Sequence, residues 1–441
     1  MRLLALLALL PSCAAPQDGP APRPNVIVIL ADDLGYADLG CHGAKDIPTP
    51  HLDALAAGGV RCTSGTVSHP FCSPTRAGLL AGRYQQRFGH ENNPKWDPAD
   101  ETLGLPVQVP TVADALRAAG YRTGAVGKWH LGAAPRFHPN RRGFDEYFGI
   151  LGGGHQYFPV ARSAAEYSIP VDRNGQAVDE PEYLTRAFSR EAAAFVERHR
   201  GRPFFLYLAY NAPHTPMQAP KETVAKFASI ADEKRRTYAA MVSEVDDGVG
   251  LVLRRLRELG LEERTLVFFL SDNGGPPSAN ASSNGPLRGA KGQVYEGGIR
   301  VPFLVRWPGR LRAGATYDAP VSSIDLFATA AAAAGARAEG LEGVDLVPYL
   351  AGEKAGVPHE RLFWRSGGGE RWAVREGNWK LLDAGEGRML FDLAADPGET
   401  TDLASKHPDV AERLARAYAD WDRGNVKPLW DNPRAAPRKQ P

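Results

Sequence analysis

The sequence predicts an α/β protein with a mostly parallel sheet flanked by helices, followed by a smaller antiparallel sheet that packs against one helix. Three short, nearly unbroken apolar runs are typical of buried strands, helical patterns lie between them, and the pattern changes near residue 350. The 441 residues are 43% hydrophobic, which is enough for a large core. We expect an N-terminal segment over residues 1–24, a large domain over 25–350 and a small one over 351–441.

Residues 1–24 resemble an export signal followed by a tether. Arg2 precedes a short apolar run over residues 3–10, which is far too short to span a bilayer. The next residues resemble a bacterial lipobox and make Cys13 a candidate lipid anchor, whereas Ala14-Ala15 offers ordinary signal-peptidase cleavage. We expect an exported protein that is periplasmic, anchored to the membrane as a lipoprotein, or extracellular.

The strands of the large domain are predicted over residues 25–30, 204–208 and 266–270. Each run leads into polar residues, and open α/β sheets usually bind their ligands just beyond the carboxyl ends of such strands. Proline at a first helical position, a capping-box pattern at Thr111 and amphipathic periodicity predict the helices between them. These helices cover residues 50–57, 111–119, 183–200 and 233–259.

The small domain is predicted from short strand-like pieces separated by glycine-rich turns, with a helical pattern after them. We expect one antiparallel sheet with this helix packed on it. The pieces cover residues 362–364, 371–374, 379–382 and 389–393, and the helix covers 408–423.

The carboxyl ends of two predicted strands offer a candidate metal site. Asp32-Asp33 follows the first strand and Asp272-Asn273 follows the third, so four hard oxygen ligands belong to one sheet. Oxygen ligation favours Ca²⁺ or Mg²⁺ over zinc. The alternative is that these pairs are ordinary solvated turn residues.

Charge and cysteine content exclude some classes of protein. The 52 basic and 51 acidic residues are balanced, and no basic stripe with interleaved aromatic residues occurs, so nucleic acid is not an expected partner. The four cysteines do not form a disulfide framework. Cys41 and Cys62 either form a bridge in an oxidising compartment or are free thiols.

The run Cys72-Ser73-Pro74-Thr75-Arg76 is the most informative motif. A helix is predicted to start just past Cys72, and its free N–H groups and dipole would favour an anion. Arg76 would add a fixed positive charge at the same place. The alternatives are a buried or metal-binding cysteine and an arginine in a surface ion pair.

Two lysines and two histidines lie in glycine- or proline-rich segments. Lys128 and His130 are two positions apart in a strand-like segment, so they are predicted to share one face. His214 lies in a proline-stiffened loop, and Lys291 lies between glycines. Each could hold an anionic oxygen or move a proton, and each could equally be an ordinary loop residue.

Together, these motifs resemble the type I sulfatases of the alkaline phosphatase superfamily, in order and in residue type. The likeness covers most of residues 25 to 405, and residues 210–218 are similar to arylsulfatase and N-acetylgalactosamine-6-sulfatase relatives. The matching segments are Asp32 to Gly40, Cys72 to Arg83, Gly120 to Gly132, His214, Asp272-Asn273, Lys291, Val301 to Gly309 and Phe391 to Glu399.

The resemblance implies an alkaline-phosphatase-like fold and a formylglycine made from Cys72 by a formylglycine-generating enzyme. It also implies one cation, Ca²⁺ rather than Mg²⁺, bound by Asp32, Asp33, Asp272, Asn273 and the modified Cys72. The expected reaction is the hydrolysis of sulfate from a sulfated glycan or a small aryl sulfate ester.

The roles of the remaining residues are implied in the same way. Arg76 and the cation would polarise the sulfate, and Asp272 would assist deprotonation of the attacking hydroxyl. His214 with Lys291 would bind sulfate and protonate the leaving alcohol. His130 would act as the later base. Lys128 would orient the nucleophile and the sulfate.

Two other functions stay open at this point. One is a phosphate or phosphonate monoester hydrolase of the same superfamily, and the other is an inactive glycan-binding surface protein whose cysteine is never oxidised. Loops around His69, residues 90–93 and residues 155–157 are candidates for the wall of a sugar pocket.

Overall fold

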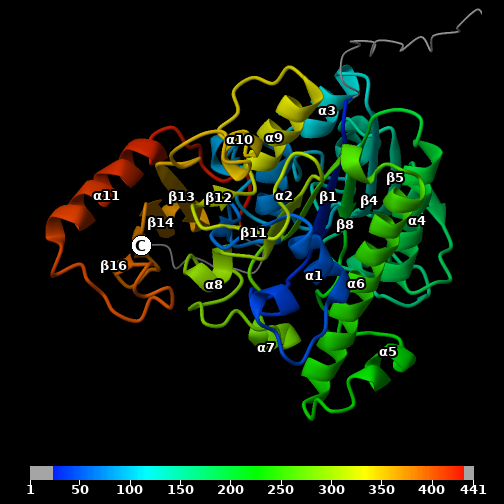
Figure 1. Ribbon diagram of the computed structural model, residues 1–441, viewed down its shortest axis with the longest axis horizontal. Helices are drawn as coiled ribbons and strands as arrows, with labels where there is room; N and C mark the ends of the chain where they lie inside the picture. The colour runs from blue at the N-terminus through cyan, green and yellow to red at the C-terminus, as the bar shows by residue number, and fades with distance from the viewer. Residues whose placement is uncertain (1–22, 432–441) are drawn as a thin grey trace, which may run out of the picture.

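The computed structural model describes residues 23–431 (Figure 1). The candidate lipid anchor Cys13 and the export segment before it lie outside the described residues.

The strands are β1 Asn25–Ala31, β2 Val60–Cys62, β3 Gly65–Thr66, β4 Arg122–Lys128, β5 Glu146–Ile150, β6 Val171–Arg173, β7 Gln176–Val178, β8 Phe204–Ala209, β9 Thr265–Ser271, β10 Phe303–Arg306, β11 Ala315–Tyr317, β12 Val321–Ser322, β13 Arg361–Ser366, β14 Arg371–Glu376, β15 Trp379–Asp383 and β16 Arg388–Asp392. The helices are α1 Pro50–Ala57, α2 Cys72–Ala81, α3 Val112–Ala118, α4 Leu184–Arg198, α5 Lys221–Lys226, α6 Glu233–Glu258, α7 Pro277–Asn280, α8 Glu296–Ile299, α9 Asp325–Ala334, α10 Val347–Leu350 and α11 Pro408–Asp422.

A ten-stranded sheet forms the centre of the molecule, in the order β11-β2-β10-β9-β1-β8-β4-β5-β6-β7. The five central strands, from β9 to β5, run parallel, while β10, β6 and β7 add antiparallel pairs toward the edges. The three predicted strands are β1, β8 and β9, side by side in the middle of this sheet. The prediction of a mostly parallel sheet flanked by helices is confirmed.

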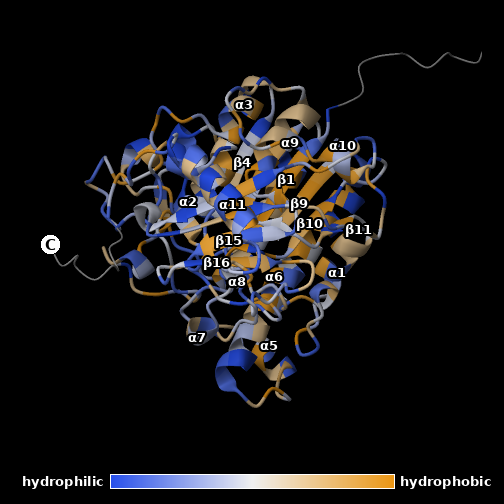
Figure 2. Cartoon of the chain, turned by 90° about the vertical axis from the view of Figure 1, so that its left-hand side faces the viewer, coloured by the Kyte–Doolittle hydropathy of each residue, from blue (hydrophilic) through white to orange (hydrophobic). Residues whose placement is uncertain are grey.

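Helices cover both faces of the large sheet, because the side chains of its central strands are apolar on both sides. In β1, Val26 and Val28 belong to the core that includes α2, α3 and α9. Ile27 and Ile29 point to the opposite core, which is formed with α1, α4 and α6. Figure 2 shows β1, β9 and β10 as strongly hydrophobic strands with helices around them. The burial of both faces explains the unbroken apolar runs of the sequence.

The four strands β13 to β16 form a separate antiparallel sheet at one side of the molecule, with α11 packed on it (Figure 1). One face of this sheet, with Leu362 and Trp364, joins a core of the large sheet. The other face, with Val374 and Leu381, packs on Leu414 of α11 and its neighbours. A boundary at residue 350 stays a prediction, since the two sheets share one hydrophobic core.

Within residues 23–431, Cys41 and Cys62 are both free thiols, so the bridge between them is not formed. In the same range, no helix combines the length and the apolar character that crossing a bilayer would require.

Candidate active site

The carboxyl ends of β1 and β9 bring the predicted metal ligands together. The two strands are parallel neighbours with Ala31 opposite Ser271, so the residues that follow lie side by side. The Asn273 side chain donates from Nδ2 to Asp33 Oδ1 at 2.7 Å, and the Asp33 amide donates to Asp272 Oδ1 at 3.3 Å. All of these side chains are buried. The candidate metal site is therefore one cluster, formed by residues about 240 positions apart.

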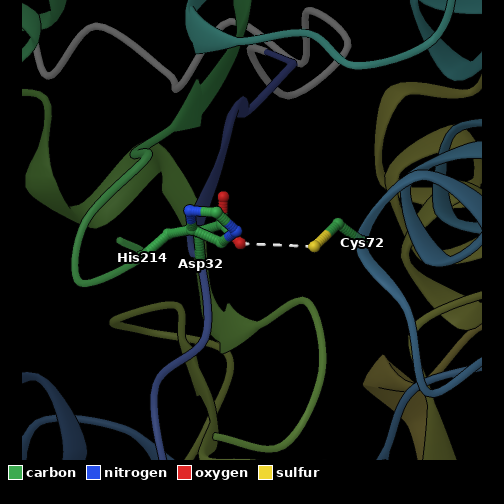
Figure 3. A group of neighbouring side chains, drawn as sticks. All are labelled: Asp32, Cys72 and His214. Carbon is green, nitrogen blue, oxygen red and sulfur yellow. Dashed lines mark hydrogen bonds between the residues drawn. The ribbon is translucent and has the colours of Figure 1, made fainter. Parts of the chain in front are cut away.

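Cys72 lies at the edge of this cluster, as the first residue of the fully buried helix α2. Its thiol donates to Asp32 Oδ1 at 3.4 Å, and Figure 3 shows this contact together with the neighbouring His214. Burial, together with Asp272 and Asp32, raises the pKa of the Cys72 thiol far above its usual range. The thiol is therefore neutral and a poor nucleophile, because only thiolates attack readily.

Three cations face the three carboxylates. Arg76 Nη2 is 2.8 Å from Asp272 Oδ2 and 3.6 Å from Asp32 Oδ2, and the buried Lys128 ammonium pairs with Asp32. Lys291 Nζ is 2.7 Å from Asp33 Oδ1. Burial alone would raise the pKa of Asp32, but Lys128 and the other cations nearby hold it well below its usual range. Asp32 is therefore a permanent carboxylate.

Lys128 and His130 reach the site in a different way from the one predicted. Strand β4 ends at Lys128, and His130 lies past that end with a φ of 57°, so the two do not share a strand face. Lys128 points to Asp32, and His130 lines a pocket beside Cys72. Burial and then Lys128 lower the pKa of His130 well below its usual range, so its ring is neutral.

His214 follows β8 and completes the group of side chains in Figure 3. Its Nδ1 is 2.7 Å from the Thr215 carbonyl, which can only accept, so Nδ1 carries a proton. Nε2 is then the atom that can gain or lose one, and it lies 3.6 Å from Asp33 Oδ2. The Tyr157 hydroxyl supports this loop through the carbonyls of Asn211 and His214, at 2.6 and 2.7 Å.

The cluster fits a hard cation. Ligand atoms of Asp32, Asp33, Cys72 and Asp272 all lie within 4.8 Å of one another. The Asn273 Oδ1 atom is buried and has no hydrogen-bond partner in the described part of the chain, which is costly unless it binds a ligand. Burial and the neighbouring Asp32 also raise the pKa of Asp272 to about 6. A cation would relieve both costs, and four of the five donor side chains offer oxygen.

A cavity of about 260 Å³ opens beside this cluster. Cys72, His130, His214 and Lys291 line it, so the predicted site residues are exposed to one space. Its other walls come from Phe71, from the irregular segment Asn92 to Trp96, and from a second loop, in which Gly153 precedes a short 3-10 helix that holds Glu166 and Tyr167. The Trp96 indole joins the loops by donating to the Ala164 carbonyl at 3.1 Å.

Of the loops predicted to line a sugar pocket, only part reaches this cavity. Asn92 and Asn93 line the cavity, whereas His69 and His90 are fully buried and His155 lines a separate pocket. Lys95, Trp96, Glu166 and Tyr167 escaped the sequence analysis because no periodic pattern or motif marks irregular loops. Their proximity depends on tertiary contacts alone.

Comparison with known proteins places this site in a family. A sulfatase family profile matches residues 24–336, and the C-terminal profile of N-sulphoglucosamine sulphohydrolase matches residues 290–420. Arylsulfatase A of Bos taurus is 35% identical over 90% of this chain and 86% of its own length. N-acetylgalactosamine-6-sulfatase of Canis lupus familiaris is 35% identical over 93% and 88%.

Comparison with solved structures agrees with the comparison of sequences. The crystal structure of Ps i-CgsB in complex with k-i-k-neocarrahexaose has a TM-score of 0.89 and 39% identity, covering 93% of this chain and 95% of that one. A phosphonate monoester hydrolase from Silicibacter pomeroyi, with 19% identity and a TM-score of 0.67 over 92% and 96%, shares the fold alone. The fold is thus that of the alkaline phosphatase-like enzymes. On these grounds the chain belongs to the sulfatase family and is a sulfatase, an enzyme that hydrolyses sulfate esters.

Proposed function

We propose that this sulfatase removes sulfate from a sulfated carbohydrate, using a formylglycine made from Cys72 and one bound Ca²⁺. The observation that carries the proposal is the position of Cys72. Its sulfur lies in a cluster of carboxylates and cations, facing the cavity with His130, His214 and Lys291. As a thiol it has no ionised form there, since burial raises its pKa. Oxidation to an aldehyde, followed by addition of water to its carbonyl, would give the same position a hydrate whose hydroxyl can act as the nucleophile.

The residues of the cluster would hold the cation and the nucleophile. Asp32, Asp33, Asp272, Asn273 and the modified Cys72 would be the ligands. Bound Ca²⁺ would supply positive charge that polarises the sulfate oxygens. The aldehyde hydrate would supply two hydroxyls on one carbon, one to attack the sulfate ester and one to expel sulfate afterwards.

The cationic side chains would orient the reacting groups. Arg76 Nη1 donates to the Lys128 carbonyl at 3.1 Å, and its other nitrogens bind Asp272, so the guanidinium is held rigidly. Lys128 is held by Asp32 in the same way. Such preorganised charges stabilise the negative charge of a transition state without further rearrangement.

Three side chains would move protons. Asp272 would assist deprotonation of the attacking hydroxyl. His214 would donate from Nε2 to the leaving alcohol, with Lys291 beside it on the sulfate. The neutral ring of His130 would take the proton of the second hydroxyl, since burial and the Lys128 charge lower its pKa.

The cavity walls support a carbohydrate substrate. Trp96 and Tyr167 offer aromatic rings and Lys95 offers a positive charge around the cavity. Aromatic rings pack on the apolar faces of sugars, and a cation attracts further anionic groups. The similar Ps i-CgsB holds a neocarrahexaose in its crystal structure. With the export segment of the sequence, we propose a sulfated polysaccharide outside the cytoplasm as the substrate.

The test has two measurements on protein expressed with a formylglycine-generating enzyme. The mass of the peptide across residue 72 should show the aldehyde in place of the thiol. Sulfate release from sulfated oligosaccharides should be abolished in Cys72→Ala and retained in Cys41→Ala, the matched control at another free thiol. Turnover that survives Cys72→Ala would refute the covalent mechanism. Turnover of para-nitrophenyl sulfate but of no sulfated saccharide would refute the substrate class alone.

A further inference from the structure

The segment from Phe391 to Glu399 begins in the last residues of β16 and continues past the strand; it matched the family pattern but has no part in the mechanism above. Its last residue has an unusual conformation and environment. Glu399 is fully buried and has a φ of 52°, in the left-handed region that non-glycine residues rarely adopt. The Asp396 carboxylate holds this turn by accepting from the amides of Thr400 and Thr401, at 2.7 and 2.8 Å. The turn therefore directs a carboxylate into the protein.

Glu399 makes its contacts with a second buried acid and one lysine. Its Oε2 accepts from the Glu296 amide at 2.6 Å, and its Oε1 is 2.8 Å from Lys380 Nζ. The same Lys380 Nζ is 2.9 Å from Glu296 Oε1. All three side chains are inaccessible to solvent. This cluster, Glu296-Lys380-Glu399, joins strand β15 of the small sheet to the first residue of helix α8.

The segment before α8 is the loop that carries Lys291, and Glu399 also contacts its beginning. Arg288 Nη1 donates to the Glu399 carbonyl at 2.9 Å, and its guanidinium lies 4.1 Å from the centre of the Tyr295 ring. The Gly297 amide donates to the Arg288 carbonyl at 2.7 Å and closes the loop. Both ends of the Lys291 loop, residues 288 and 296, are thus bound to Glu399.

At its tip, the same loop contacts the catalytic centre. The Gly292 amide donates to the Pro70 carbonyl at 2.9 Å, two residues before Cys72. A side chain at position 292 would lie 2.8 Å from the Phe71 ring, so the approach is close. The Lys291 ammonium is 2.7 Å from Asp33 Oδ1. The position of the loop therefore sets the position of the Lys291 charge.

We infer that Glu399 and Lys380 are positioning residues, which fix the Lys291 loop so that its lysine faces Asp33 and the sulfate. The inference rests on the role proposed above for Lys291. A buried ion cluster is weak grounds for stability, because apolar residues of similar volume often stabilise a protein equally well. The Glu296-Lys380-Glu399 cluster does impose directional contacts, because the carboxylates of both glutamates must pair with the ammonium group of Lys380. The small C-terminal sheet thus takes part in building the sulfate-binding side of the active site.

Glu399→Gln tests this inference, because it keeps the shape of the side chain and removes its charge. The amide of glutamine would either face Lys380 or leave the Glu296 amide without an acceptor. Misplacing a catalytic group slightly costs roughly 10- to 100-fold in rate, so kcat/KM for para-nitrophenyl sulfate should fall by such a factor. Glu412→Gln is the matched control, since it breaks an exposed ion pair with Arg388 of the same sheet. It should leave kcat/KM unchanged.

A double-mutant cycle with Lys291→Ala separates positioning from a general structural role. If Glu399 acts through Lys291, Glu399→Gln should cost nothing further in the Lys291→Ala background. Equal losses in both backgrounds, or no loss in either, would overturn the inference. The affinity for inorganic sulfate, measured by calorimetry, gives the same cycle where turnover is too slow to measure.

A substitute variant and the Lys291→Ala single mutant distinguish failure of this inference from failure of the role proposed for Lys291. If Glu399→Gln does not fold, Arg288→Met replaces it in the cycle, because Arg288 is exposed and its loss leaves the buried cluster intact. Arg288→Met should then lower kcat/KM, and again only where Lys291 is present; additive losses would overturn the inference. Unchanged activity and sulfate affinity in Lys291→Ala would instead refute the proposed role of Lys291 itself.

Discussion

Removal of the calcium ion proposed for the carboxylate cluster should destabilise this protein, and the size of the effect follows from the linkage between binding and folding. Asp32, Asp33 and Asp272 are buried together, and the Asn273 oxygen has no partner among the described residues. A cation that binds only the folded state stabilises it by about 4 kcal/mol when present at roughly 1,000 times its Kd. For a chain of 441 residues, the entropy of unfolding at Tm is about 0.9 kcal/mol/K. Chelation should therefore lower Tm by about 4 °C.

The assay is thermal unfolding in EGTA, followed by the return of calcium or magnesium. Calcium should restore Tm, and magnesium should restore less, because a site of several carboxylates without strict octahedral geometry favours the larger ion. Asn273→Ala is the informative variant. A tenfold loss of affinity would reduce the stabilisation by about 1.4 kcal/mol. If EGTA leaves Tm unchanged, the cluster holds no structural cation. If magnesium equals calcium, the choice of ion is wrong.

Two more predictions concern single side chains. His214→Ala should lower kcat/KM for sugar sulfates roughly 10²- to 10⁴-fold, the range for general acid catalysis, and should hurt para-nitrophenyl sulfate less, since nitrophenolate leaves without a proton. Equal losses for both substrates would argue against an acid at Nε2. Thr111→Ala removes the capping box of α3, in which Thr111 and Asp114 satisfy each other's amides, and should cost about 1 kcal/mol in the free energy of unfolding. Denaturant unfolding should show no such cost for Thr102→Ala at an exposed site; a similar loss there would contradict the capping argument.

Much of the fold followed from local patterns. The apolar runs that became β1, β8 and β9 are buried on both faces, so hydrophobic burial alone requires nearly every residue to be apolar. The start of α1 at Pro50 and the cap of α3 at Thr111 are also local, because each depends on neighbours within one turn. Strand β5 was missed, since its five residues include a glutamate and a glycine.

The chemistry of the site also followed from residue types, but its geometry did not. Asp32, Cys72 and His214 could be selected because few residue types bind hard cations, become aldehydes or move protons near neutral pH. The prediction that Lys128 and His130 share a strand face was wrong, because β4 ends at Lys128 and His130 adopts a left-handed conformation that no spacing rule encodes.

By itself, the sequence determined the central strands, the main helices and the side chains that can carry out sulfate chemistry, since these depend on short-range properties of the chain. Only the tertiary structure decided which loops enclose the cavity and how the distant turn at Glu399 holds the loop of Lys291. The contacts of Glu399 with Glu296 and Arg288 join residues more than 100 positions apart. They form only when the two sheets pack on a common core, and no local pattern specifies that packing.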